Sequence, residues 1–278
     1  GIRSDIKFEL NFPSIKSTKK PQIAILREQG VNGHYEMAAA FHYAGFEAID
    51  VHMQDLIDGN YVITDFRAFV ACGGFSYGDV LGAGEGWSKV ILNNSMLRDQ
   101  FSSFFNQSNS IALGVCNGCQ MMSNLKSIIP GADKWPKFVK NLSDQFESRV
   151  VTVKIPKNKS IFFNEMENSY IPVITAHGEG RAYFSKSNDL KEMIQKEQIT
   201  LQYVTNNHEV TTIYPLNPNG SVDGVTGFTN DDGRFNIMMP HPERVFRSDQ
   251  NTWSRVKQND YGPWFKMFTN AQYFLNNS

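Results

Sequence analysis

The stretch Ile111 to Met122, IALGVCNGCQMM, constrains the fold more than any other part of the sequence. It begins as an apolar run bounded by polar residues, which predicts a buried strand. The pattern breaks at GVCNG, residues 114–118, and continues as a predicted helix. A strand, a sharp turn and a helix make a nucleophile elbow, here with Cys116 at the position that serine usually holds.

The residues around Cys116 suit a nucleophile. Gly114 and Gly118 flank it, and glycines at these positions relieve the crowding of a tight turn. The helix that follows directs its free N–H groups and the positive end of its dipole toward the sulfur, which favours the thiolate. The N–H of Asn117, the next residue, is a natural donor to an oxyanion.

Two other interpretations of Cys116 stay open at this point. Most cysteines in chains of this kind are small buried hydrophobic residues. Cys116 and Cys119 also form a C-x-x-C pair at a helix start, which is typical of a redox pair or of half a zinc site. A zinc site lacks its second pair, because Cys72 is the only other cysteine.

Strands and helices are predicted to alternate along the chain. Strands are expected at 23–26, 46–51, 69–72, 111–115, 151–155, 171–175, 201–204 and 235–239, and helices at 37–44, 87–105, 117–122, 188–196 and 263–275. This order predicts an α/β fold with a doubly wound, mostly parallel sheet flanked by helices, which binds its ligands beyond the carboxyl ends of the strands. Cys116 and the Gly73-Gly74 pair, whose N–H groups would face a ligand, both follow such strands.

A cysteine nucleophile needs a base and a third group that orients the base. Of the six histidines we favour His241, which follows the last predicted strand. Glu243 would fall on the same side of an extended segment, and Pro242 is expected to hold that segment away from a helix. His177 is the rival base, although the glycines around it suggest a loop that shapes a pocket. Cys72, at the end of a strand, is expected to be core.

Charge and apolar content limit the partners. Lys plus Arg total 27 and Asp plus Glu 28, for a net charge of -1, so nothing favours a nucleic acid or an anionic membrane. No apolar run reaches the ~18 residues that span a bilayer. Three cysteines in 278 residues indicate a reducing compartment, and we expect a cytoplasmic protein. Residues 1–20 show no period and are predicted to be a linker or arm, with one domain over 21–278.

The motifs resemble those of a known family. GVCNGCQ at 114–120 with the later HPE at 241–243 is similar to the triad-type, or class I, glutamine amidotransferases. Within them, LREQGVNG at 26–33, ACGGFSYGDVLGAGEGW at 71–87 and MPHPERVF at 239–246 closely resemble formylglycinamide ribonucleotide amidotransferase, also called phosphoribosylformylglycinamidine synthase. The likeness runs from about Pro21 to the C-terminus and favours the glutaminase domain of the large single-chain form, with the separate small glutaminase subunit as the alternative.

The resemblance implies an activity and roles for residues. Cys116 would attack the side-chain amide of L-glutamine, His241 would act as base and acid, and Glu243 would orient it. The other positions that it implies are an oxyanion hole from the backbone of Gly74 and Asn117, and substrate contacts from Gln120, Gly73, Ser76, Tyr77, Asp79 and His177. It implies no cofactor or metal in this domain. A synthase domain would be the partner, and ATP and Mg²⁺ are expected there.

Overall fold

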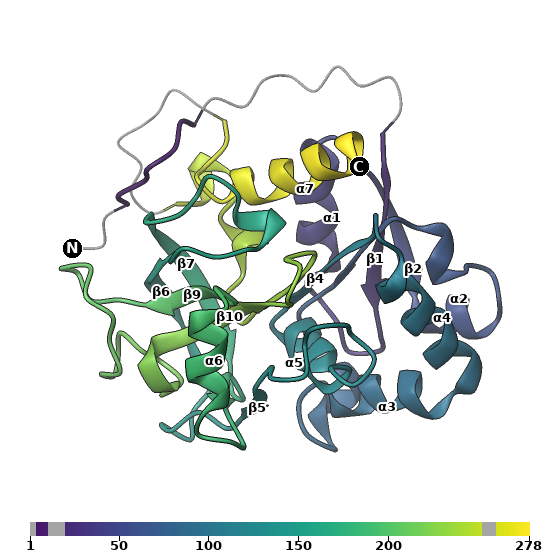
Figure 1. Cartoon of the computed structure of the whole chain (residues 1–278), viewed down its shortest axis with the longest axis horizontal. Coiled ribbons are helices and arrows are strands. Elements are labelled where there is room, and N and C mark those ends of the chain that lie inside the picture. The colour runs from purple at the N-terminus through teal and green to yellow at the C-terminus, as the bar shows by residue number, and fades with distance from the viewer. Residues whose placement is uncertain (1–3, 11–19, 252–259) are drawn as a thin grey trace.

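The computed structural model describes residues 4–10, 20–251 and 260–278, and its centre is a nine-stranded sheet (Figure 1). The sheet order is β2-β1-β3-β4-β11-β10-β9-β6-β7. The strands are β1 (Gln22–Arg27), β2 (Glu47–His52), β3 (Ala68–Ala71), β4 (Ile111–Val115), β6 (Glu147–Lys154), β7 (Tyr170–His177), β9 (Ile199–Tyr203), β10 (Val225–Thr229) and β11 (Phe235–Met238). A separate pair joins β5 (Lys137–Val139) to β8 (Arg181–Tyr183).

The sheet has a parallel and an antiparallel half. Adjacent strands are parallel in the run β2-β1-β3-β4-β11 and antiparallel in the run β11-β10-β9-β6-β7, so β11 is the strand at which the direction changes. Helices cover the parallel half on both faces, so its inner strands are buried throughout, as in β3 (AFVA) and β4 (IALGV), whereas the edge strand β2 is mostly exposed or half-buried. The predicted doubly wound α/β fold is therefore confirmed, and the elbow lies in its parallel half.

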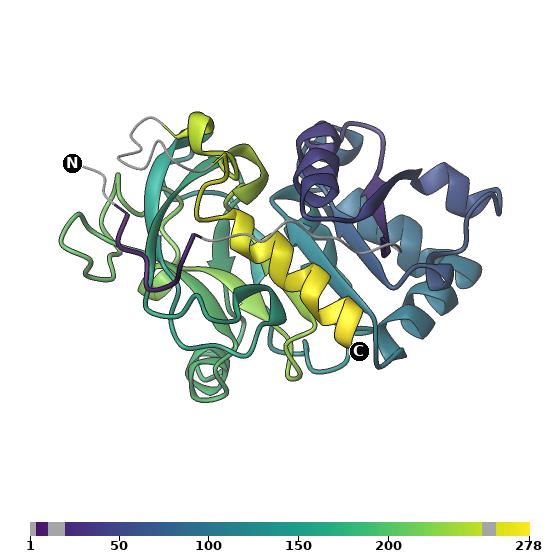
Figure 2. The same ribbon diagram turned by 90° about the horizontal axis from the view of Figure 1, so that it is seen from above.

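The helices lie on opposite faces of the sheet. Helix α1 (His34–Tyr43) packs against β1, β2 and α7 (Phe265–Asn277), while α5 (Asn117–Asn124) packs against β3, β4 and β11. Figure 2 shows α7 crossing the molecule between the parallel half, in blue and purple, and the antiparallel half, in green. The remaining helices are α2 (Met53–Ile57), α3 (Glu85–Asn93), α4 (Ser95–Asn106) and α6 (Asp189–Gln195).

Several elements differ from the sequence prediction, which did not include α2, β5 or β8. The single helix expected over 87–105 is two helices, because the chain is extended at Asn94 and its side-chain oxygen accepts from the N–H of Leu97 to begin α4. Strand β10 was not predicted, since VTGFT has no clear alternation and contains a glycine. Of the predicted arm 1–20, residues 1–3 and 11–19 lie outside the described residues.

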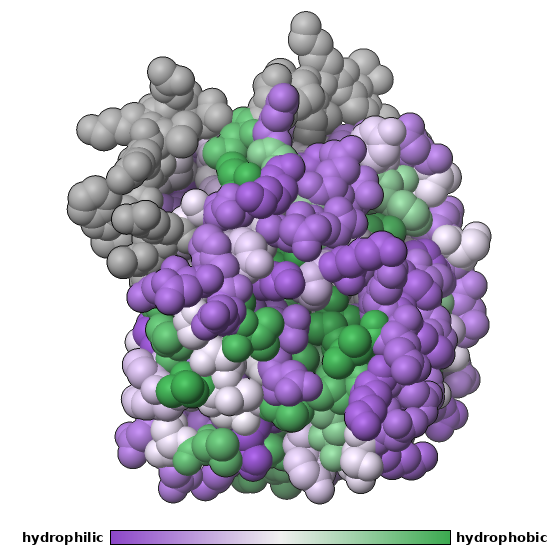
Figure 3. Space-filling model, turned by 60° about the vertical axis from the view of Figure 1, so that its left-hand side comes forward, coloured by the Kyte–Doolittle hydropathy of each residue, from purple (hydrophilic) through white to green (hydrophobic). Residues whose placement is uncertain are grey.

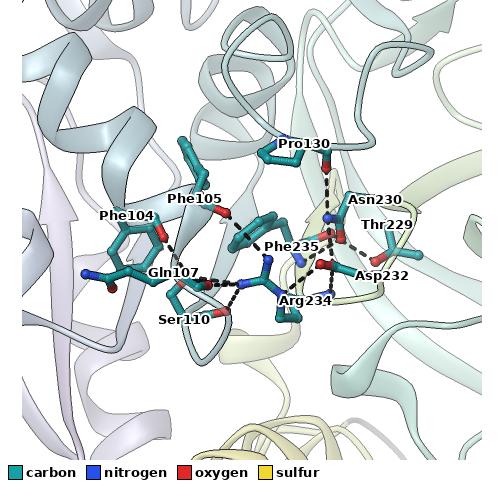
Figure 4. Close-up of polar contacts among 10 residues, drawn as sticks. All are labelled: Phe104, Phe105, Gln107, Ser110, Pro130, Thr229, Asn230, Asp232, Arg234 and Phe235. Carbon is teal, nitrogen blue, oxygen red and sulfur yellow. Dashed lines mark hydrogen bonds and ion pairs between the residues drawn. The ribbon is translucent and has the colours of Figure 1, made fainter.

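A polar cluster at the amino end of β11 fixes this strand beside β4 (Figure 4). Arg234 donates to the carbonyl oxygen of Ser110 at 3.0 Å and to the Asp232 carboxylate at 2.8 Å. The buried Asn230 side chain donates to the Pro130 carbonyl at 3.0 Å and accepts from the Phe235 N–H at 3.0 Å. These contacts therefore hold the amino end of β11, away from the carboxyl end from which the chain continues to His241.

The surface is not uniformly polar. Figure 3 shows one face on which hydrophobic residues gather in the lower half, beneath a hydrophilic band. Exposed apolar side chains also follow Gly73-Gly74 in the loop at 75–81, namely Phe75, Val80 and Leu81. No helix among the described residues is long and apolar enough to cross a membrane.

The close packing of α5 on β3 makes Gly118 a sensitive position. A Cβ there would lie 2.0 Å from the carbonyl oxygen of Ala71, a backbone atom that cannot move without disturbing β3. We expect Gly118→Ala to lower the free energy of unfolding by about 3 kcal/mol, as overpacked cores do. Urea denaturation measures this, and Gly178→Ala, where the nearest atom is 3.9 Å away, is the control. An equal loss in both variants would contradict the packing argument.

Candidate functional site

Cys116 occupies a strained turn between β4 and α5. Its backbone has φ 53° and ψ -109°, a conformation that costs a residue with a side chain about 1–3 kcal/mol and is typical of functional sites. Its N–H donates to the Met238 carbonyl of β11 at 2.9 Å, which anchors the turn. The side chain is 5% exposed, and Sγ lies 3.6 Å from the Ala176 carbonyl oxygen at the end of β7. The predicted strand-turn-helix is therefore present, with the thiol at its apex.

His241 and Glu243 form a buried pair beyond β11. Nδ1 of His241 and Oε1 of Glu243 are 2.6 Å apart, and both side chains are almost completely buried. The His241 N–H donates to the Ile174 carbonyl of β7 at 2.8 Å. The expected extended segment was wrong: Pro242 begins a short 3-10 turn, Pro242–Arg244, since proline favours the first position of a helix. The turn still brings the carboxylate to the imidazole.

The other imidazole nitrogen of His241 is directed to the thiol side of the site. A Cβ built on Gly73 would lie 2.8 Å from Cε1 of His241 and 3.3 Å from Cβ of Cys116, so both residues border the same point. Nε2 of His241 has no hydrogen-bond partner among the described residues. Burial disfavours the charged ring, but the Glu243 carboxylate and then the Cys116 thiolate outweigh it and raise the pKa of His241 to about 10. The ring is held as an imidazolium beside the sulfur.

The two backbone N–H groups predicted to form an oxyanion hole, those of Gly74 and Asn117, have no protein acceptor among the described residues. Asn32 N–H donates to the Gly73 carbonyl and Phe75 N–H to the Gly30 carbonyl, a pairing that directs the Gly74 N–H away from the 30–32 loop. Gly74 has φ 152°, and a Cβ there would lie 2.5 Å from Cα of Val31. Asn117 is the first residue of α5, where the helix supplies no partner. In the described part of the chain neither N–H donates to a protein group.

Asp79 and Gln120, two of the side chains predicted to hold a substrate, bind the Asn117 side chain. Asn117 binds Asp79 and Gln120, with Nδ2 3.1 Å from Oδ1 of Asp79 and 3.2 Å from Oε1 of Gln120. Gln120 also donates to the Glu179 carbonyl at 2.7 Å, so its amide already holds the loop after β7. Burial, and then the charge of Glu179, raise the pKa of Asp79 to about 6.

Ser76 and Tyr77 lie in the same loop. The Ser76 hydroxyl is buried and has no hydrogen-bond partner among the described residues. Desolvation, followed by a hydrogen bond to Glu28 and the charge of Glu28, raises the pKa of Tyr77. Of these two, the structure leaves only Ser76 with an unused polar group.

Sequence reasoning missed Glu179. Besides its carbonyl contact with Gln120, its Oε2 accepts from the Ala83 N–H at 3.1 Å, so Glu179 joins the loop after β7 to the loop before α3. The available signal was the HGEG run at 177–180, in which one charged residue stands between two glycines.

His177, the rival base, has the opposite electrostatics from His241. Its Nε2 lies 3.2 Å from Nδ2 of Asn219, an amide that can only donate, so the ring accepts there and is neutral. Burial, and then the charge of His241, lower the pKa of His177 to about 3. A ring that remains neutral above this pH, with no carboxylate to orient it, suits a wall of the site better than a base.

The neutral His177 predicts a loss of stability in acid. As pH falls below about 6.5, the unfolded chain binds a proton that the folded ring accepts only near pH 3, so the free energy of unfolding falls across this window. We expect His177 to account for about 2 kcal/mol of loss by pH 5. Urea denaturation at pH 7 and 5 should show a smaller loss in His177→Gln than in the wild type. The exposed His42→Gln is the control, and equal losses in all three proteins would contradict the assignment.

The environment of Cys119 does not favour a redox pair with Cys116. All three thiols are free, and Cys72 and Cys119 are completely buried. Burial raises the pKa of the Cys119 thiol well above its usual range, with a further rise from the Cys116 charge, so Cys119 is a poor partner for disulfide exchange. Across residues 4–10, 20–251 and 260–278, no group of three His, Cys, Asp or Glu side chains is placed to hold a metal ion.

Comparison with solved structures gives the same fold at low sequence identity. A chain of the PurLQS structure from Thermotoga maritima is 21% identical with a TM-score of 0.67, and the match covers 93% of this chain and 99% of that one. The glutaminase domain of Trypanosoma brucei CTPS with bound acivicin is 12% identical, with a TM-score of 0.50 over 91% of this chain and 94% of that one. At these identities the likeness concerns the fold alone.

A family model gives the finer assignment. The model for the CobB/CobQ-like glutamine amidotransferase domain matches residues 20–275, which include β1 and α1, the elbow and the His241–Glu243 pair. Because this match spans nearly the whole sequence, the chain belongs to the CobB/CobQ-like glutamine amidotransferase domain family.

Proposed function

We propose that this chain is the glutaminase domain of a formylglycinamide ribonucleotide amidotransferase of the large single-chain type. It hydrolyses L-glutamine to glutamate and ammonia through a thioester on Cys116. The ammonia serves the ATP-dependent conversion of formylglycinamide ribonucleotide to formylglycinamidine ribonucleotide in purine biosynthesis. The family membership supports the amidotransferase class, and the motifs at 26–33, 71–87 and 239–246 support the finer assignment.

One observation carries the glutaminase reaction. A thiol stands in a strained turn at a helix start, opposite an imidazole whose Nδ1 is 2.6 Å from a buried carboxylate and whose Nε2 has no partner in the described chain. This arrangement supports a Cys-His-Glu triad. A redox or purely structural cysteine has no need of an oriented imidazolium beside it.

The reaction follows from these positions. The Cys116 thiolate attacks the side-chain amide carbon of glutamine, and the N–H groups of Gly74 and Asn117 stabilise the resulting oxyanion, each by roughly 3 kcal/mol in the transition state. His241 gives its Nε2 proton to the departing nitrogen, which leaves as ammonia while the γ-glutamyl thioester forms. His241 then takes a proton from water as the oxygen attacks the thioester, and glutamate leaves with restoration of the thiolate and imidazolium.

The second half of the activity belongs to a partner. ATP and Mg²⁺ would act in the synthase domain, where ammonia is consumed, and this domain itself needs no cofactor. The exposed apolar side chains at 75–81, next to Gly73-Gly74, give a partner an apolar surface to cover beside the site. The resemblance to formylglycinamide ribonucleotide amidotransferase implies that the domain turns over glutamine slowly without its synthase. A test should therefore measure a single turnover of the enzyme instead of its steady-state rate.

Covalent labelling tests this proposal. The chain is treated with a glutamine-mimicking diazoketone at one equivalent per site, and mass spectrometry locates the modified residue. We expect Cys116 alone to be labelled, and we expect an excess of L-glutamine to slow the labelling. Equal labelling of Cys116 and Cys119, or labelling that glutamine does not slow, would contradict a glutaminase pocket.

A further inference from the structure

The carboxamide of Asn117 lies between the two segments that carry the proposed oxyanion donors. Its side chain is completely buried. Its Oδ1 accepts from the Ser76 N–H at 3.1 Å, and its Nδ2 donates to Asp79 at 3.1 Å and to Gln120 at 3.2 Å. One small side chain therefore joins the start of α5 to two points of the loop that follows Gly74.

That loop needs an external support. Tyr77, Gly78 and Asp79 have φ values of 54°, 61° and 54°, three successive residues in the left-handed region, which is unfavourable for tyrosine and aspartate. The Asn117 contacts lie just before this turn, at Ser76, and at its last residue, Asp79. The turn begins three residues after Gly74, and the Ser76 N–H that Asn117 holds is only two residues after it, so these contacts and the pairing with residues 30–32 act on the same short loop.

We propose that the Asn117 side chain is a positioning residue that sets the Gly74 N–H in register with the Asn117 N–H. This role rests on the proposed function, since it concerns the oxyanion of that reaction. The residue contributes a backbone donor and, through its carboxamide, holds the other donor in place. Displacement of a reacting group by about 1 Å can cost 100-fold in rate, so loss of the three contacts should be measurable.

Two reactions of Cys116 separate this role from a general effect on the site. Alkylation by iodoacetamide is a displacement at a saturated carbon and forms no oxyanion. Acylation by γ-glutamyl p-nitroanilide passes through a tetrahedral oxyanion and releases p-nitroaniline, which a stopped-flow burst measures. We expect Asn117→Ala to lower the ratio of the acylation rate to the alkylation rate by about 10- to 100-fold.

Two further variants make the test specific. Asn117→Asp keeps the volume of the side chain and the acceptor for Ser76 but loses the donor to Asp79 and Gln120, so a similar fall in the ratio cannot come from a cavity. Asn230→Ala removes another completely buried asparagine from the Figure 4 cluster at the other end of β11 and should leave the ratio unchanged.

The outcomes are distinct. A wild-type chain that is alkylated at Cys116 but never acylated would overturn the proposed function, and the role of Asn117 with it. Acylation of the wild type with an unchanged ratio in Asn117→Ala would overturn only the positioning role. Equal loss of both reactions in the two Asn117 variants would also overturn it, because the damage would then extend to the thiolate itself.

Discussion

Replacement of Cys116 by serine is expected to abolish formation of the γ-glutamyl enzyme, with a loss of about 10⁴-fold or more. In the proposed reaction the helix start and the His241 imidazolium stabilise a sulfur anion, and a serine hydroxyl is too weak an acid to form the corresponding oxygen anion there. The burst of p-nitroaniline from γ-glutamyl p-nitroanilide measures the loss. Circular dichroism and urea denaturation should be close to those of the wild type, because serine fits the same turn.

The matched control is Cys119→Ser, three residues along the same helix. This thiol is completely buried and takes no part in the proposed reaction, so acylation should continue even if the variant is less stable. A protein that used Cys116 and Cys119 as a redox pair would lose its activity in both variants. The two variants therefore decide between the amidotransferase and the redox interpretation.

Replacement of Glu243 by glutamine is expected to lower the rate of acylation of Cys116 by γ-glutamyl p-nitroanilide by about 10³- to 10⁴-fold. The carboxylate is the first charge that holds His241 protonated against the effect of burial. Without it the pKa of His241 falls, so the ring carries the proton for the departing nitrogen over a narrower pH range. The amide can also bind the wrong tautomer of the imidazole.

The pH dependence of acylation distinguishes this effect from a loss of packing. In the wild type the alkaline limb should follow the loss of the His241 proton near pH 10. In Glu243→Gln it should move down by about two pH units, since an adjacent opposite charge contributes a shift of that order. An unmoved alkaline limb with a lower plateau would mean that Glu243 has a structural role only.

The parts of the fold that the sequence predicted well are those with strong local patterns. Apolar runs such as 23–26 and 111–115 are short, continuous and bounded by polar residues, and both became buried parallel strands. The break at Asn94 depends on a side-chain cap that the apolar spacing of 87–105 does not show. Strand β10 is stabilised by its pairing with β9 and β11, a tertiary effect that the pattern of its own residues does not predict.

The site was predictable where a reactive side chain comes directly after a strand. Cys116 and His241 each come just beyond the carboxyl end of a strand, and a parallel sheet brings such ends together. The contacts of Asn117 were not predictable, because they depend on a left-handed turn at 77–79 whose tyrosine and aspartate do not favour it. The neutral state of His177 likewise depends on Asn219, a partner 42 residues away.

The pairing of β4 with β11 determines when, during synthesis of the chain, the candidate site can be assembled. The hydrogen bond from Cys116 to Met238 joins residues that the ribosome makes far apart in time. A nascent chain with α5 complete has the nucleophile but neither the imidazole nor the strand that steadies the turn. The proposed triad is therefore incomplete until the C-terminal part of the domain has been synthesised and has folded.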